Sequence, residues 1–209
     1  QMNVVVTKHE IATGKLVGKT AAFKRTTQWN NGEYITYMDG YVYIALDSGA
    51  VKRIKTDAIT ADETAVVEDY SFTAEGLSGK ITGFTYNALV NKLAVTAGDK
   101  VFIVGAKSMK VESSVACASS GRVGSGCDAN YIYVLYEKNN AYGTAKFNVY
   151  DWSGNLVKSA VEIPNLISVQ NQNNVQSMCV INGEYYFLVS RWSSGGTLVK
   201  VTFDTSVLK

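Results

Sequence analysis

The chain is poor in the residues that nucleophilic and metal-dependent catalysis require. Its 209 residues include one histidine (His9), one proline and three cysteines. A single imidazole in a predicted N-terminal strand gives no basis for a Ser-His-Asp triad. One histidine and three scattered cysteines do not give the spacing of a zinc site, and no Asp-x-Asp-x-Asp-Gly calcium loop is present. We therefore expect no catalytic triad, no metal site and no cofactor.

The three cysteines, Cys117, Cys127 and Cys179, are odd in number and too few for a disulfide framework. Buried free thiols are expected, with a single disulfide as the alternative.

Charge is also scarce, because charged residues make up 18% of the chain and the net charge is +2. A nearly neutral chain has no electrostatic attraction to nucleic acid or to an anionic membrane surface. No run of about eighteen apolar residues occurs, so no membrane-spanning helix is expected. The N-terminus has no basic segment followed by an apolar one, so no signal peptide is visible.

Strand and turn residues dominate what is present. The chain contains 18 Gly and 13 Tyr, with many Asn, Val and Thr, and 46% of its residues are hydrophobic. This composition predicts an all-β protein whose turns are made by Gly, Asn and Asp, since proline is nearly absent.

A repeat runs through the sequence. An apolar residue followed by Asp or Asn precedes a strongly β segment four times, with the Asx residues 48, 41 and 54 positions apart. The pairs are Met38-Asp39, Tyr86-Asn87, Cys127-Asp128 and Ile181-Asn182. A Gly-containing turn, a third strand and, in three units, a fourth strand follow; the predicted fourth strands are Thr64–Val67, Lys110–Ala116 and Leu156–Ile163.

Four short strands repeated about every 48 residues predict the blades of a compact β-propeller over residues 1–209 as a single domain. One twisted sheet cannot bury both faces alone, whereas radial packing buries both. The length left between the last and first repeats favours four blades. A hairpin of Val4–Lys8 and Leu16–Ala21 would then close the ring by completing the last blade. Five blades, one incomplete, and a β-sandwich are the alternatives.

The segment from Asn91 to Val111 resembles a blade of the YVTN/NHL class of β-propeller repeats. It reads N-K-L-A-V-T-A-G-D-K-V-F-I-V-G-A-K-S-M-K-V, with Gly105 in place of the usual Asp and Ser108 in place of the usual Thr. The resemblance implies an architecture only, because this class serves many binding functions. It also implies an extracellular or virion location, since compact propellers occur in cell-surface, secreted and phage-tail proteins.

Glycoside cleavage is the enzymatic alternative, and it needs two facing carboxylates about 5 to 10 Å apart. Only Glu33 lies at the edge of a predicted innermost strand. Asp39, Asp128 and Asn182 occupy one repeated turn position, where an Asx side chain bonds its own backbone. We therefore predict that these three are structural and that the chain is not an enzyme.

Ligand-binding residues are predicted on the loops that join second to third strands and successive blades. These are Trp29, Asn30, Tyr142, Arg191 and Trp192. Flat aromatic rings stack on sugars, and the polar neighbours can bond hydroxyl groups; packing between blades is the alternative role of the aromatic residues. Trp152, in a turn on the opposite face, is a candidate contact for a partner.

The function predicted from these features is a non-enzymatic recognition or adhesion module that binds a surface glycan or a protein partner. The first alternative is a structural scaffold subunit of a larger assembly, such as a phage tail or virion. The second is a glycan-cleaving propeller that depends on Glu33.

Overall fold

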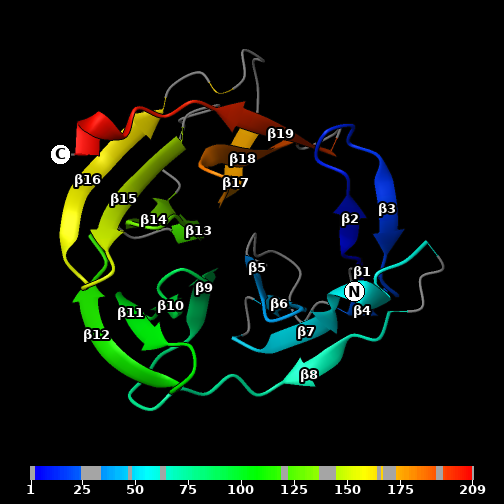
Figure 1. Cartoon of the computed structure of the whole chain (residues 1–209), viewed down its shortest axis with the longest axis horizontal. Coiled ribbons are helices and arrows are strands. Elements are labelled where there is room, and N and C mark those ends of the chain that lie inside the picture. Colours follow the sequence, from blue (N-terminus) through cyan, green and yellow to red (C-terminus); the bar gives the residue numbers. More distant parts are fainter. Residues whose placement is uncertain are drawn as a thin grey trace.

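The computed structural model describes residues 3–24, 34–46, 49–61, 65–118, 122–136, 145–163, 166, 173–191 and 195–208. Four small antiparallel sheets stand around a ring, which is the arrangement of a four-bladed β-propeller (Figure 1). The all-β prediction and the choice of four blades are confirmed. None of the described helices has the length and apolar character needed to cross a bilayer.

Each sheet consists of strands that follow one another in the sequence. The first contains β5 (Tyr34–Met38), β6 (Tyr41–Ala45), β7 (Val51–Lys55) and β8 (Glu68–Tyr70). The second contains β9 (Ile81–Asn87), β10 (Lys92–Ala97), β11 (Lys100–Gly105) and β12 (Lys110–Ala116). The third contains β13 (Arg122–Cys127), β14 (Tyr131–Tyr136), β15 (Ala145–Asp151) and β16 (Leu156–Ile163). The fourth contains β17 (Asn173–Ile181), β18 (Glu184–Arg191) and β19 (Gly195–Val201).

The first strand of each sheet lies innermost, and two of the four first turns are built on an Asx-Gly pair. Asp39 and Gly40 have φ angles of 50° and 81°, and Asn182 and Gly183 have φ angles of 53° and 78°. Two successive positive φ angles are the signature of the hairpin turn that matches the twist of its strands, and Asn-Gly and Asp-Gly supply them at least cost. The structural role predicted for these Asx residues is confirmed.

Apolar side chains fill the spaces between neighbouring sheets. One cluster, which includes Tyr43 and Phe84, joins the first and second sheets, and another, which includes Ile103 and Ile132, joins the second and third. A third cluster, around Phe147 and Phe187, joins the third and fourth sheets. Burying an aromatic side chain of this size contributes about 1.5–3 kcal/mol. These clusters hold neighbouring sheets together, as the predicted radial packing requires.

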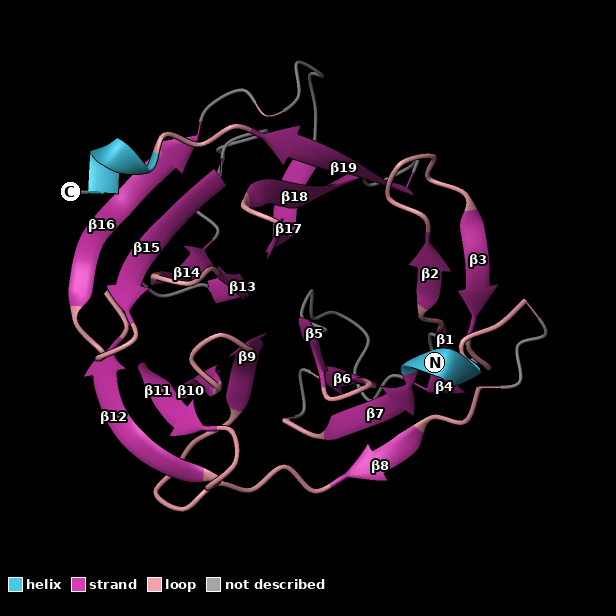
Figure 2. Cartoon of the chain, in the orientation of Figure 1, coloured by secondary structure: helices cyan, strands magenta, loops and turns pink. Residues whose placement is uncertain are grey.

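The N-terminal hairpin lies where the ring closes, between the fourth and first sheets (Figure 2). It consists of β2 (Thr7–His9) and β3 (Leu16–Lys19), and β1 (Asn3–Val4) pairs with β4 (Phe23–Lys24). Within the described residues it forms a sheet of its own and does not add a fourth strand to β17–β19. The predicted closure is therefore confirmed in position, while the predicted pairing with the last blade is wrong.

The hairpin attaches to the first blade instead. The Lys19 amide donates to the Thr60 carbonyl at 2.8 Å, and Thr20 forms a parallel bridge to Ala65. Val6 and Phe23 pack against a buried cluster on the outer part of the first sheet. Thr60 and Ala65, which receive the hairpin, follow the short helix η1 (Thr56–Ala58).

The end of the chain does not complete the fourth sheet either. After β19 it crosses to the third sheet, where the short helix η2 (Thr205–Leu208) buries Leu208 in the cluster around Phe147 and Phe187. Among the described residues, the fourth sheet thus has three strands where the other three have four.

Substitution of Gly18 tests the docking of the hairpin. A Cβ on Gly18 would lie 2.6 Å from the Thr60 carbonyl carbon, which is a backbone atom with little freedom to move. Gly18→Ala should lower the free energy of unfolding by about 1–3 kcal/mol in urea denaturation. Val17→Ala, whose side chain is 47% exposed in the same strand, is the control and should change stability by less than about 0.5 kcal/mol. Equal stability of the two variants would show that the hairpin is not held against Thr60.

Candidate functional site

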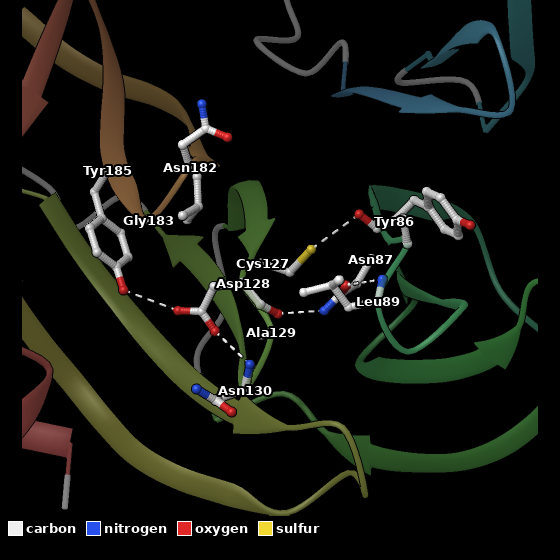
Figure 3. Close-up of a pocket in the computed structure, with 12 residues that line it drawn as sticks. Tyr86, Asn87, Leu89, Cys127, Asp128, Ala129, Asn130, Asn182, Gly183 and Tyr185 are labelled. Atoms are coloured by element: carbon white, nitrogen blue, oxygen red, sulfur yellow. Dashed lines mark hydrogen bonds between the residues drawn. The ribbon is translucent and has the colours of Figure 1, made fainter.

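A pocket of about 550 Å³ opens near the axis of the ring, at the end where innermost strands turn into second strands (Figure 3). Turns from three blades form it, those that follow β9, β13 and β17. The lining residues are Tyr86, Asn87, Ala88, Leu89, Cys127, Asp128, Ala129, Asn130, Val180, Asn182, Gly183 and Tyr185. The pocket therefore takes its walls from the repeated Asx turns.

Asp128 is the carboxylate in this pocket, and four donors bind it. The backbone amides of Asn130 and Tyr131 each donate to Oδ1 at 2.8 Å. The hydroxyl groups of Tyr133 and Tyr185 donate to Oδ2 at 2.5 and 3.0 Å. Tyr133 belongs to the third blade and Tyr185 to the fourth, so one carboxylate joins two blades as well as closing its own turn.

The two tyrosines are held as neutral donors. Burial raises the pKa of Tyr133 above its ordinary value, and the hydrogen bond to Asp128 raises it further. Burial also raises the pKa of Tyr185. Their hydroxyl oxygens lie 3.1 Å apart, and both rings are buried. Asp128 consequently has its lone pairs occupied by fixed donors and is poorly placed to act as a base or a nucleophile.

The backbone of Asp128 is fixed from two other directions. The Asn87 side-chain amide, from the second blade, donates to the Asp128 carbonyl at 2.6 Å, and the Trp152 indole donates to the same oxygen at 3.1 Å. Asn87 also accepts from the Leu89 amide at 2.9 Å, which closes its own turn. Trp152 is buried between the second and third sheets, so the suggestion that it contacts a partner is wrong.

A second cavity, of about 370 Å³, continues from the pocket into the channel between the innermost strands. All four blades line it, and it shares Tyr86, Cys127 and Val180 with the pocket. The Tyr86 peptide is held from both sides here. Its amide donates to the Thr36 hydroxyl of the first blade at 3.2 Å, and its carbonyl accepts from the Cys127 thiol of the third at 3.3 Å.

The cysteines are free thiols, as predicted, but none of the three is fully buried, since Cys117 and Cys127 are partly buried and Cys179 is exposed. Cys127 accepts from the Thr85 hydroxyl at 3.3 Å, and burial raises the pKa of its thiol to about 11. Cys179 is exposed, which corrects the expectation for this residue. Its partner across the sheet is Tyr186 on β18.

The open wall of the pocket offers amide and apolar groups to a ligand. Asn130 and Asn182 are exposed, and Leu89 is 81% exposed beside the half-buried Tyr86. The Tyr86 hydroxyl donates to the Asn91 side chain at 3.2 Å. Amide donors and acceptors in a lining that also contains an exposed aliphatic side chain suit a neutral ligand that has both polar and apolar surfaces.

The residues predicted to bind ligand are not among the described residues that line this pocket. Trp29, Asn30, Tyr142 and Trp192 lie outside the described residues, as does Glu33, and Arg191 ends β18 with its side chain likewise outside them. Sequence reasoning missed the pocket because it interpreted the Asx turns as structural only. The repetition of the turns was the available signal, since equivalent turns of successive blades must gather around one axis. In the described part of the chain, no three His, Cys, Asp or Glu side chains are grouped closely enough to hold a metal ion.

The fold and the axial pocket place the chain among small β-propellers. No protein-family model matches the sequence, so the resemblance to YVTN/NHL repeats is not confirmed as membership of that family. No curated protein matches it either.

Solved structures share the fold at low sequence identity. A glutaminyl cyclase from Myxococcus xanthus superposes with a TM-score of 0.52 at 13% identity, over 81% of this chain and 73% of the cyclase chain. A chain of the mitotic checkpoint complex gives 0.51 at 10% identity, over 95% and 69%. The tail fibre of a Staphylococcus aureus phage gives 0.50 at 11% identity, over 83% of this chain and 50% of the fibre chain. At these identities the likeness establishes the propeller fold alone.

Removing one hydroxyl tests the role of Asp128 as a junction between blades. Tyr133→Phe deletes a buried donor to the carboxylate and should lower the free energy of unfolding by about 1–3 kcal/mol. Tyr37→Phe is the control, because its ring is 60% exposed, and its effect should stay within about 0.5 kcal/mol. Thermal or urea unfolding measures both, and a Tyr133→Phe protein as stable as the control would contradict the assigned role.

Alkylation rates should separate the two channel cysteines. A thiol with a pKa of about 11 remains protonated at pH 8, with a thiolate fraction of about one in a thousand. Iodoacetamide should therefore modify Cys179 before Cys127 in the native protein. Burial raises the pKa of Cys179 too, but this residue is exposed to the reagent. Peptide mapping by mass spectrometry reads both sites, and equal rates would contradict the described environment of Cys127.

Proposed function

We propose that the chain is a binding module that holds a carbohydrate in the axial pocket and does not cleave it. The observation that carries the proposal is the composition of the pocket wall. The lining combines the exposed amide side chains of Asn130 and Asn182 with the exposed aliphatic side chain of Leu89. Sugars present hydroxyl edges and apolar faces, which match amides and aromatic or aliphatic surfaces respectively.

The state of Asp128 supports binding over hydrolysis. Glycoside cleavage uses one carboxylic acid and one carboxylate that are free to exchange protons or attack carbon. Asp128 instead accepts four hydrogen bonds from fixed donors. Glu33, the carboxylate of the enzymatic alternative, lies outside the described residues.

The propeller neighbour from a phage tail fibre agrees with a role in adhesion, although the likeness concerns the fold. The loop residues Trp29, Asn30, Tyr142, Arg191 and Trp192 remain a second proposed surface for the same kind of ligand. Arg191 ends β18, and the sequence predicts the other four on loops that join second to third strands or successive blades, whereas the pocket lies among first-to-second-strand turns. The two surfaces can therefore be separated by mutation.

A glycan array followed by titration with the best sugar tests the pocket. Asn130→Ala and Leu89→Ala should each weaken binding about tenfold, which corresponds to about 1.4 kcal/mol. Leu156→Ala is the control for the second variant, since Leu156 is 44% exposed on the outer strand β16 and should leave affinity unchanged.

Three outcomes would overturn parts of the proposal. Loss of binding in Trp29→Ala or Trp192→Ala, with the pocket variants unaffected, would move the site to the loops. Absence of binding to any sugar at millimolar concentration would remove carbohydrate as the ligand class. Release of a hydrolysis product that disappears in Glu33→Gln would make the chain an enzyme.

A further inference from the structure

The fourth sheet ends in a strand whose outer edge pairs with no described residue. β19 bonds β18 on one side, and on the other side no described strand lies next to it (Figure 1). A free edge of this kind presents unpaired backbone N–H and C=O groups and can accept a further strand. In the other three sheets that position is filled by β8, β12 and β16.

In two of the complete sheets, basic residues of the third strand bond acidic residues directly opposite on the fourth. Arg53 on β7 donates to Glu68 on β8 at 2.8 Å, and Lys52 pairs with Asp69 beside it. In the third sheet, Lys146 on β15 pairs with Glu162 on β16 at 2.8 Å. In these two blades the fourth strand therefore brings acidic side chains to basic residues of the third strand.

Lys200 on β19 occupies the position that Arg53 occupies on β7. Tyr43 lies four residues after Asp39 and pairs across the sheet with Arg53. Tyr186 lies four residues after Asn182 and pairs with Lys200. Arg53 has its acid on the fourth strand and lies 4.8 Å from the centre of the Tyr41 ring. Lys200 instead bonds Glu184, which occupies the position in the fourth sheet that Tyr41 occupies in the first. The Lys200 side chain is 54% exposed, against 32% for Arg53.

Apolar side chains beside Lys200 are also uncovered. Leu188 and Leu198 face each other across β18 and β19 and are 40% and 57% exposed. They lie on the opposite side of the sheet from Phe187 and Val189, which are buried against the third sheet. The equivalent of Leu198 in the first sheet is Val51, which is 4% exposed and has Tyr70 of β8 opposite it.

We propose that the outer edge of β19 accepts an extended strand from a partner polypeptide, with an acidic residue opposite Lys200 and a large apolar residue opposite Leu198. This strand completes the fourth blade in the manner of β8. Backbone hydrogen bonds supply the affinity, and the acidic and apolar side chains set the register. The charge of the partner follows from Lys200, which is the only charged side chain on β19.

A synthetic peptide with the sequence of residues 66–72, VVEDYSF, serves as the probe because β8 supplies it. In the β8 register, its glutamate falls opposite Lys200 and its tyrosine opposite Leu198. Added to the whole chain, the peptide should slow hydrogen–deuterium exchange in residues 195–201 and bind measurably by calorimetry. A peptide with N-methyl groups on alternate amides is the matched control and should do neither, because it cannot form the ladder.

Charge reversal tests the register. Replacing the glutamate of the peptide by lysine should weaken binding to the native chain about fivefold or more. The Lys200→Glu chain should reverse this preference and bind the lysine peptide better than the original. If the Lys200→Glu chain fails to fold, the comparison of the glutamate and lysine peptides on the native chain still tests the register.

Equal binding of the glutamate and lysine peptides by the native chain would overturn the assigned register. Absence of protection in residues 195–201 would overturn the proposal that the β19 edge binds the strand. Protection of the same residues without peptide, accompanied by a dimer in light scattering, would mean that a second copy of the chain is the occupant and would also overturn the proposal.

Discussion

Burial of both faces of four small sheets is the constraint on which the rest of this structure depends. A three- or four-stranded sheet alone leaves both faces in water, so each sheet here is stabilised by its neighbours. The clusters between successive sheets satisfy this need for the second and third sheets on both sides. The first and fourth sheets each have one face at the place where the ring closes, which we call the seam. The N-terminal hairpin covers the outer part of the first, while Leu188 and Leu198 stay uncovered on the fourth.

The position of the axial pocket is a consequence of the same radial packing. Innermost strands converge on the axis, so the turns that end them meet there. Asn87 and Asp128 accept backbone amides of their own turns, and Asp128 also bonds residues of neighbouring blades. The Asp128 carboxylate accepts hydrogen bonds from the hydroxyl groups of Tyr133 and Tyr185, which belong to two blades. Its backbone carbonyl accepts a hydrogen bond from the Asn87 side-chain amide of another blade. Asp128, which suits the local geometry of its turn, therefore also connects three blades.

The strands and the blade number could be predicted because they rest on local pattern and period. β12 (Lys110–Ala116) and β16 (Leu156–Ile163) have the predicted bounds. β8 begins at Glu68, beyond the predicted Thr64–Val67, because its register is set by the pairs Arg53–Glu68 and Lys52–Asp69 across the sheet. The attachment of the hairpin could not be predicted, since it depends on the approach of Gly18 to the Thr60 backbone. The pocket was missed for a similar reason: its walls come from three turns that are far apart in sequence.

Strand β18 contributes to both the axial pocket and the sheet edge at β19, and the alternation of its side chains keeps these two sites on separate faces. Tyr185 faces the third sheet and bonds Asp128 at the pocket, whereas the next residue, Tyr186, faces the seam and pairs with Lys200. Successive side chains of a strand point to opposite faces, so a ligand in the pocket and a strand at the β19 edge contact different sides of one sheet. Occupation of one surface does not block the other. Strand β18, hydrogen-bonded to both β17 and β19, thus carries Tyr185 on one face and Tyr186 on the other.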